Sequence, residues 1–362
     1  MTTAASRRAP GAETGPAAGP DPSAGPDPSA GLHAAAGLGP AADAGLSRGW
    51  PLPFALDVPL VLSVHRRGPG DPAYARDAAG AVWRTSLTPE GPGTLRVTSR
   101  RPPATGAPPV IGAARAAGPA WVTGQAWGPG ARWLLDSLPG WLGFHDDRAG
   151  FTPCHPVVSD LALRYEGFRV GRSGRVFEAL VPAVLEQKVV SSEAHRAWRF
   201  LLVKHGEPAP GPAPAGMRVP PAPRTWARIP SWDWHRAGVE GVRARTIITA
   251  AAVAPRLEEA ADLDPAEADR RLRALPGIGA WTSAEIRQRA LGDPDAVSVG
   301  DYHLPNAVGW TLARRKTDDA GMLELLTPYA GHRYRVTRLI EMGGTRPERH
   351  GPRMSVRDYR AF

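Results

Sequence analysis

The chain has 362 residues, 42% of them hydrophobic, so it is long enough for two domains with a sizeable core. Its net charge of +9 at pH 7 and isoelectric point near 10.3 indicate a polyanionic partner. A single cysteine, Cys154, excludes an internal disulfide and an iron–sulfur cluster held by four thiolates of this chain. The sequence contains no run of about eighteen apolar residues, so it predicts no membrane span. No apolar stretch follows the N-terminal arginines, as it would in a secretion signal, so we expect a cytoplasmic protein.

Residues 1–49 consist largely of Ala, Gly, Pro and Asp, and they repeat the sequence GPDPSA at 19–24 and 25–30. Such a segment buries too little apolar surface to offset its ordering entropy, so we predict a disordered tail. The tail contains three arginines and four acidic residues, which gives it a net charge of −1, so the positive net charge comes from the rest of the chain. We therefore do not expect this tail to be a DNA-binding arm.

Residues 50–152 are predicted to form a small antiparallel β-rich domain. Strands are predicted from short segments rich in Val, Leu, Thr and Trp that Gly and Pro separate: LDVPLVLSV (56–64), AVWRTSLTP (81–89), GTLRVTSR (93–100) and PAWVTGQAW (119–127). A helix over 131–144 is expected to cover the sheet.

Residues 153–344 are predicted to be all-helical, followed by a C-terminal tail at 345–362. The segment 175–206 has apolar residues at helical spacing, with a bend expected at Pro182 and an interruption of the apolar series at Lys188. Further helices are predicted over 239–258, 264–275, 280–291, 303–314, 321–329 and 333–342. The expected fold class is α+β, an antiparallel sheet with helical cover followed by a helical domain.

The turn Gly277-Ile278-Gly279 lies between two of these predicted helices. A dinucleotide-binding turn would follow a strand within a βαβ unit, which this sequence does not predict. A glycine hairpin that opens a helix directs backbone amides at an anion, and a nucleic-acid phosphate fits this arrangement better than a mononucleotide does. By spacing alone, an ordinary turn between two helices remains an equally good interpretation.

Asp301 precedes the predicted helix over 303–314, a position where aspartate usually serves as an N-cap. Asp293 and Asp295, in the turn GDPD, compete with it for any catalytic role. Trp281, taken by itself, is expected to be a core tryptophan on an amphipathic helix.

Together, ALPGIGAWTSAEI (274–286), AVSVGDYHLPNAVG (296–309) and VPAVLEQKVVS (181–191) resemble the helix-hairpin-helix (HhH-GPD) DNA glycosylases, most closely their DNA-3-methyladenine glycosylase II branch. The resemblance covers about residues 50–342. It implies base excision repair of damaged double-stranded DNA by hydrolysis of the N-glycosidic bond of flipped alkylated purines. Trp281 stands where the bifunctional members carry a lysine, and Lys316 is the nearest lysine in the sequence, so no lyase activity is expected.

The resemblance assigns roles to single residues. Asp301 matches the catalytic aspartate and Trp281 a pocket tryptophan, with Tyr302, Glu285 and His332 as further pocket residues. DNA contacts are assigned to Gly277, Ile278, Gly279, Ala280 and Thr282, and a residue that fills the gap left by the flipped base to Val170 or Arg172. The main-chain carbonyls of Arg273, Leu275 and Ile278 would hold a structural Na⁺ or K⁺.

No cofactor for catalysis, no iron–sulfur cluster and a monomeric state are expected. Two alternatives remain open at this point. One is a glycosylase for deaminated, oxidised or etheno bases, and the other is a non-catalytic DNA-binding module that uses Asp301 only as a cap.

Overall fold

The computed structural model describes residues 45–100 and 120–346. All described residues belong to one compact unit. Most of the predicted tails, residues 1–44 and 347–362, therefore lie outside the described residues. The predicted end of the N-terminal tail at residue 49 is wrong, because residues 46–49 belong to a strand that pairs with the strand Trp121–Trp127.

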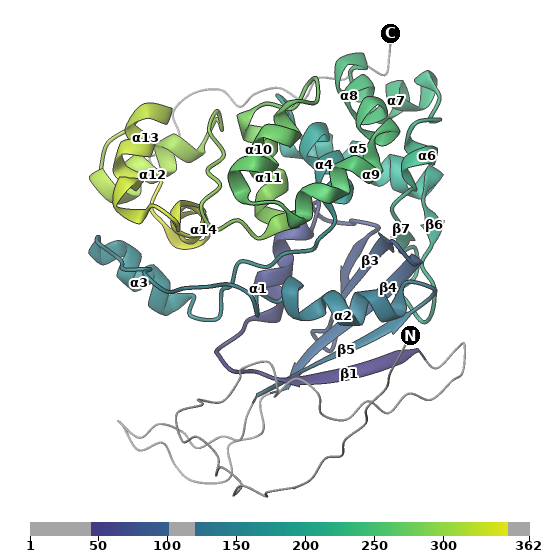
Figure 1. Cartoon of the computed structure of the whole chain (residues 1–362), viewed down its shortest axis with the longest axis horizontal. Coiled ribbons are helices and arrows are strands. Elements are labelled where there is room, and N and C mark those ends of the chain that lie inside the picture. The colour runs from purple at the N-terminus through teal and green to yellow at the C-terminus, as the bar shows by residue number, and fades with distance from the viewer. Residues whose placement is uncertain (1–44, 101–119, 347–362) are drawn as a thin grey trace, which may run out of the picture. The chain divides into compact units, whose positions relative to one another are not determined.

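An antiparallel sheet of five strands in the order β1-β5-β4-β3-β2 is formed within residues 45–127 (Figure 1). Its strands are β1 (Leu46–Pro51), β2 (Tyr74–Arg76), β3 (Val82–Thr88), β4 (Gly91–Arg100) and β5 (Trp121–Trp127). Helix α2 (Ala131–Trp141) packs on β4 and β5 through buried Leu134 and Leu138, so the antiparallel sheet and its helical cover are confirmed.

The segment LDVPLVLSV is helical, so its prediction as a strand is wrong. It forms α1 (Val58–Leu62) and a 3₁₀ turn (Ser63–His65). The Asp57 side chain accepts the amide hydrogen of Leu60 at 2.9 Å, and Pro59 lies in the first turn, where its missing amide hydrogen costs nothing. A short apolar run does not distinguish a buried strand from a buried helix, and here the cap decides.

The predicted single helix over 175–206 is two helices, α4 (Val176–Leu185) and α5 (Ser191–His205). Pro182 lies inside α4, and the chain turns five residues further on, at residues 186–190. Lys188 in this turn has a left-handed backbone with φ of +54°, which few residues other than glycine adopt.

The remaining helices are α3 (Pro156–Arg164), α6 (Pro223–Trp226), α7 (Ser231–Ala237), α8 (Gly241–Ala252), α9 (Ala254–Glu258), α10 (Pro265–Arg273), α11 (Ala280–Ile286), which a π turn (Arg287–Leu291) extends, α12 (Leu304–Ala313), α13 (Asp319–Leu326) and α14 (Arg333–Gly343). From α8 on they lie close to the predicted ranges, with 239–258 divided into two helices, whereas α3, α6 and α7 were not predicted. A two-residue ladder joins β6 (Glu207–Pro208) to β7 (Arg218–Val219). None of the helices in the described parts of the chain is long and apolar enough to cross a lipid bilayer.

Two apolar cores meet at the connection between α11 and α12. One surrounds α4, which packs on α5, α8, α9 and α11 and is buried along nearly its whole length. The other joins α3 to α12, α13 and α14 through residues such as Val308, Leu326 and Ile340. Figure 1 shows the group α12–α14 beside α10 and α11, so the segment 292–303 between α11 and α12 runs from one core to the other.

Candidate active site

The hairpin between α10 and α11 contains two glycines with different structural demands. Gly277 has φ of +90°, and a Cβ atom there would lie 2.2 Å from Oγ1 of Thr246, so both conformation and space require glycine. Gly279 has φ of −94°, and no atom lies within 4 Å of where its Cβ would be. The open space before the first turn of α11 therefore allows a ligand to approach the backbone at Gly279.

The amides at the start of α11 are directed toward this open space. The first intrahelical bond runs from the amide of Ser283 to the carbonyl of Gly279 at 2.9 Å, so the amides of Ala280, Trp281 and Thr282 precede the helical ladder. Ile278 is 5% exposed and packs in the α4 core. The residues predicted to bind DNA therefore offer main-chain groups, whereas the Ile278 side chain fastens the hairpin to the fold.

Gln187, which lies in the turn between α4 and α5, holds the hairpin in place by two hydrogen bonds. Its Nε2 donates to the carbonyl of Gly277 at 2.9 Å and to Oγ1 of Thr282 at 2.8 Å. Thr282 is buried, so its hydroxyl serves the fold and does not face a ligand. The next residue, Lys188, is exposed beside the hairpin on its left-handed backbone. The sequence did not indicate this proximity, because about ninety residues separate the two segments.

The prediction that Val170 or Arg172 fills the gap in the DNA is wrong. Val170 is 5% exposed in the α3–α14 core, and its amide donates to Asp146 at 3.0 Å. The Arg172 guanidinium donates to the carbonyl of Ala261 at 3.1 Å. Val170 is buried, and the partly buried Arg172 is held by a main-chain carbonyl, so neither is free to enter a duplex.

Asp301 lies at the end of the segment 292–303 and contacts Trp281 on α11. The indole Nε1 of Trp281 donates to Oδ2 of Asp301 at 3.2 Å. Oδ1 accepts the amide hydrogens of His303 and Leu304 at 2.8 and 2.9 Å, so Asp301 also caps α12. Trp281 is only partly buried, which differs from the expected core tryptophan. One carboxylate oxygen is thus used by the fold, and the other faces a partly exposed aromatic ring.

Glu285, one turn after Trp281, holds the loop that carries Asp301. Its Oε1 accepts the hydroxyl of Ser298 at 2.6 Å, and its Oε2 accepts from Arg289 at 2.7 Å. Although burial disfavours its charged form, Arg289 has a pKa raised above its ordinary value, chiefly by Glu285. Gln288 donates to the same Ser298 hydroxyl at 2.9 Å. Both Glu285 oxygens have partners within the protein, so Glu285 positions the loop.

The structure gives the other two predicted pocket residues different surroundings. Tyr302 is 86% exposed and contacts the ring of His303 edge-on, so it lines no enclosed pocket. His332 is 9% exposed, and its Nε2 lies 3.1 Å from the carbonyl of Ala149. Arg335 donates to the Nδ1 of His332 at 3.4 Å, which makes Nδ1 the acceptor and Nε2 the protonated nitrogen. His332 therefore joins α14 to the segment before α3.

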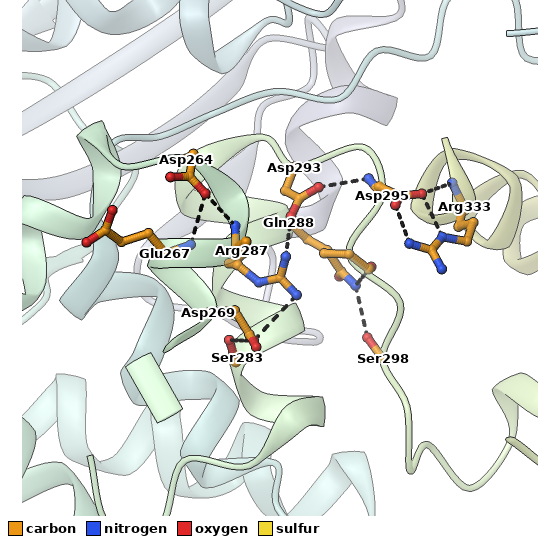
Figure 2. A network of polar contacts seen from close by, with 12 residues as sticks. Asp264, Glu267, Asp269, Ser283, Arg287, Gln288, Asp293, Asp295, Ser298 and Arg333 are labelled. Carbon is orange, nitrogen blue, oxygen red and sulfur yellow. Dashed lines mark hydrogen bonds and ion pairs between the residues drawn. The ribbon is translucent and has the colours of Figure 1, made fainter. Parts of the chain in front are cut away.

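The acids of the turn GDPD are ion-paired, as Figure 2 shows. Asp293 accepts from Arg287, and Asp295 accepts from Nε of Arg333 at 2.8 Å. Burial opposes the ionisation of Asp295, but the hydrogen bonds from Arg333 lower the pKa of that carboxyl below its ordinary value. These pairs fix the start of the loop and leave Asp301 as the carboxylate beside Trp281.

The carbonyls of Arg273, Leu275 and Ile278 surround the turn between α10 and α11. They are neutral oxygen donors of the kind that hold K⁺ in other proteins. The Leu275 carbonyl accepts the amide of Ile278 at 3.1 Å and keeps a second lone pair, and cation binding by the three carbonyls stays a prediction. Within the described ranges, no group of three or more His, Cys, Asp and Glu side chains is placed to hold a metal ion.

No family model matches the chain. Over 151 residues it is 32% identical to two curated proteins, each named probable bifunctional transcriptional activator/DNA repair enzyme AlkA, from the Mycobacterium tuberculosis strains CDC 1551 and H37Rv. The matched region spans 41% of this chain but only 30% of the length of these relatives.

Solved structures share the fold over most of the chain. A 3-methyladenine DNA glycosylase from Archaeoglobus fulgidus superposes with a TM-score of 0.63 at 16% identity, covering 81% of this chain and 97% of that one. An 8-oxoguanine glycosylase/lyase from Clostridium acetobutylicum, solved with double-stranded DNA, gives 0.55 at 12% identity, covering 82% and 97%. The chain therefore has the fold of these DNA glycosylases, and part of its sequence is similar to that of the AlkA proteins.

Proposed function

We propose that this chain is a monofunctional DNA glycosylase of base excision repair that hydrolyses the N-glycosidic bond of alkylated purines of the 3-methyladenine type. The observation that carries the proposal is the hydrogen bond from Trp281 to Oδ2 of Asp301 at 3.2 Å. It sets an electron-rich aromatic ring and a carboxylate side by side, next to a hairpin suited to a phosphate. An ordinary helix cap has no need of this partly exposed indole.

DNA binding is assigned to the hairpin and its surroundings. The amides of Gly279, Ala280 and Trp281 would donate to a backbone phosphate, favoured by the positive end of the helix dipole. Lys188 is exposed and directly follows Gln187, which contacts the hairpin, so we assign its side chain to enter the duplex. A monovalent cation on the carbonyls of Arg273, Leu275 and Ile278 would add positive charge at the same phosphate.

The leaving group explains why so few catalytic groups suffice. A 3- or 7-alkylated purine carries a positive charge, so the electron pair of the C1′–N bond neutralises the base as it departs. The sugar becomes an oxocarbenium-like cation, which the Asp301 carboxylate stabilises. Water then bonds to C1′, and its proton passes to Asp301 and on to solvent. Flipping the base out costs a few kcal/mol, which phosphate contacts offset.

Selection of damaged bases is assigned to Trp281. An indole facing a cationic purine contributes roughly 0.5–2 kcal/mol that a neutral purine does not receive. Glu285 is not assigned this role, because Ser298 and Arg289 occupy its two carboxylate oxygens.

The deciding experiment measures release of methylated purines from alkylated duplex DNA by the wild type and by Asp301→Asn. Asparagine keeps the oxygen that caps α12, removes the charge and replaces the oxygen that accepts from Trp281 by an amide group. We expect Asp301→Asn to slow release by about 10²–10³ with unchanged DNA affinity and melting temperature. Equal release by both proteins would refute the role of Asp301. If both proteins bind DNA but neither releases methylated purines, deaminated, oxidised or etheno bases become the substrates to test. If none of these is released either, the chain is a non-catalytic DNA-binding module.

A further inference from the structure

A groove of about 580 Å³ lies away from the Trp281–Asp301 pair, between the segment 59–76, helix α5 and the loop 214–217. Three arginines from separate segments line it: Arg66, Arg76 and Arg199. Tyr74, Val203 and Met217 contribute apolar surface between them. Its size is that of a ligand site, and its most prominent chemistry is positive charge.

The three guanidinium groups are exposed and uncompensated. Within residues 45–100 and 120–346, none of them forms an ion pair, and Arg66 uses its Nε to donate to the carbonyl of Gly68 at 3.2 Å. Asp71 is the one acid in the lining, and it is 6% exposed. Its carboxylate already accepts from the amides of Arg67 and Ala73 and from Trp198. A ligand of this groove must therefore bring several negative charges.

The floor of the groove is closely fitted to α5. Gly68 has φ of +73°, and a Cβ there would lie 2.3 Å from Nδ1 of His195. Gly70 has φ of +70°, and its Cβ would lie 3.6 Å from Nη1 of Arg199. The loop carrying Arg66 thus lies flat against the helix carrying Arg199, which fixes the spacing of the two cations.

Two contacts connect the loop that carries Arg66 to the hairpin. Glu186 pairs with Arg67 at 3.2 Å, and the next residue, Gln187, donates to the carbonyl of Gly277 in the hairpin. Arg199 lies eight residues beyond the start of α5, or about 12 Å at 1.5 Å per residue. Phosphates of one DNA strand recur about every 3.4 Å of helix axis, so this interval corresponds to about three or four nucleotides.

We propose that Arg66, Arg76 and Arg199 form a second contact for the DNA backbone, which holds phosphates that flank the nucleotide at Asp301. The inference rests on the proposed function for the identity of the partner. Guanidinium groups suit this ligand because their planar fork binds phosphate oxygens in pairs. The apolar surface between them accommodates sugar and does not distinguish bases, so the contact adds affinity without sequence preference.

The test is the full chain carrying Arg66→Gln, Arg76→Gln and Arg199→Gln together, compared with the wild type by anisotropy of a labelled duplex over a salt series. Each phosphate contact contributes about 0.9 to the slope of log affinity against log salt, so the slope becomes shallower by about 2 to 3. We expect affinity at low salt to fall at least tenfold and the KM for alkylated DNA to rise in parallel.

The matched control replaces three exposed arginines outside the groove that also lack ion pairs among the described residues: Arg132, Arg164 and Arg224. It removes the same net charge, so it separates a local contact from the general attraction of a basic protein to DNA. Equal losses in both triple variants, or no loss in the groove variant, would overturn the proposal. If the wild type binds DNA but releases no base, the proposed function fails, while the salt slopes still decide on the groove.

Discussion

The hydroxyl of Ser298 donates to Oε1 of Glu285 at 2.6 Å, and this bond joins the loop that ends at Asp301 to the helix that begins at the hairpin. The carbonyl of Ser298 in turn accepts the amide of Asp301 at 3.2 Å. Trp281, Glu285 and Gln288 are spaced at i, i+4 and i+7, so one face of α11 and its π turn contacts the loop at three points. The carboxylate is therefore positioned by the same helix whose first amides we propose to bind a phosphate.

Replacing Ser298 tests this positioning. We expect Ser298→Ala to lower the free energy of unfolding by about 1–3 kcal/mol, because Glu285 and Gln288 lose a buried partner. Excision should also slow by about tenfold, since a 1 Å misplacement near the reacting atoms costs up to 10²-fold. Single-turnover release at saturating DNA measures the second effect without a contribution from affinity.

Ser283→Ala is the matched control, because Ser283, on α11, is another buried serine that donates to a carboxylate, Asp269, at 2.6 Å. It should cost similar stability and leave the rate of release unchanged. If both variants slow release equally, the contact between Ser298 and Glu285 is only structural.

The two glycines of the hairpin give a second prediction. Gly277→Ala should lower both the melting temperature and DNA affinity, because of its φ of +90° and the 2.2 Å approach to Thr246. Gly279→Ala should leave the melting temperature unchanged, since its φ is −94° and its surroundings are open. Its methyl group would nevertheless stand where a phosphate approaches. Unaltered DNA affinity in Gly279→Ala would contradict phosphate binding at the hairpin.

Local patterns of the sequence predicted most of the fold, because alternation and helical spacing are properties of neighbouring residues. The strands β3 to β5 and the helices from α8 to α14 follow from such patterns. Arg289, one turn after Glu285, also lies at such a local spacing. The carbonyl of Val64, which accepts from Arg289, does not, because it is 225 residues away in the chain.

For the candidate site, too, the sequence predicted what depends on residues near each other in the chain and missed contacts between distant segments. The position of Asp301 after the hairpin is a matter of sequence spacing, and the structure brings it to Trp281. Lys188 was missed as a neighbour of the hairpin, because only the turn between α4 and α5 brings it there. Val170 appeared accessible in the sequence, yet it is buried by α14, whose contacts no local pattern reports.

Buried His65 gives a prediction for pH dependence. It is 5% exposed, and burial, together with the charges of Arg84, Arg289 and Arg67, holds its pKa well below the ordinary value of 6.5. As the pH falls through about 6.5, the unfolded chain gains a proton at this ring that the native protein does not bind. The free energy of unfolding should therefore decrease by up to about 1.4 kcal/mol per pH unit below that point.

The measurement is the free energy of unfolding of the wild type and of His65→Gln by denaturant titration between pH 5 and 7.5. The variant should show a shallower decrease toward acid pH than the wild type. His235→Gln, at an exposed position on α7, serves as the control and should keep the wild-type slope. Identical slopes in all three proteins would show that His65 does not stay neutral in the native protein.

Lys188 permits a test of the proposed absence of lyase activity, because it directly follows Gln187, which contacts the hairpin. We expect no enzyme–DNA adduct when borohydride is added to the wild type during excision, since Trp281 occupies the position where the lyases carry their nucleophile. Lys188→Gly should weaken DNA binding by removing the ammonium. It should not lower the melting temperature, because glycine relieves the left-handed strain of about 1–2 kcal/mol.

Lys188→Gln is the companion variant, which removes the charge and keeps the strained backbone. A loss of DNA affinity shared by both variants, with a higher melting temperature for the glycine variant alone, would separate the role of the cation from that of the backbone. An adduct trapped in the wild type and absent from both variants would show instead that Lys188 attacks C1′ as a Schiff-base nucleophile. In that case Asp301 would activate an amine in place of water, and the enzyme would cleave the strand after removing the base.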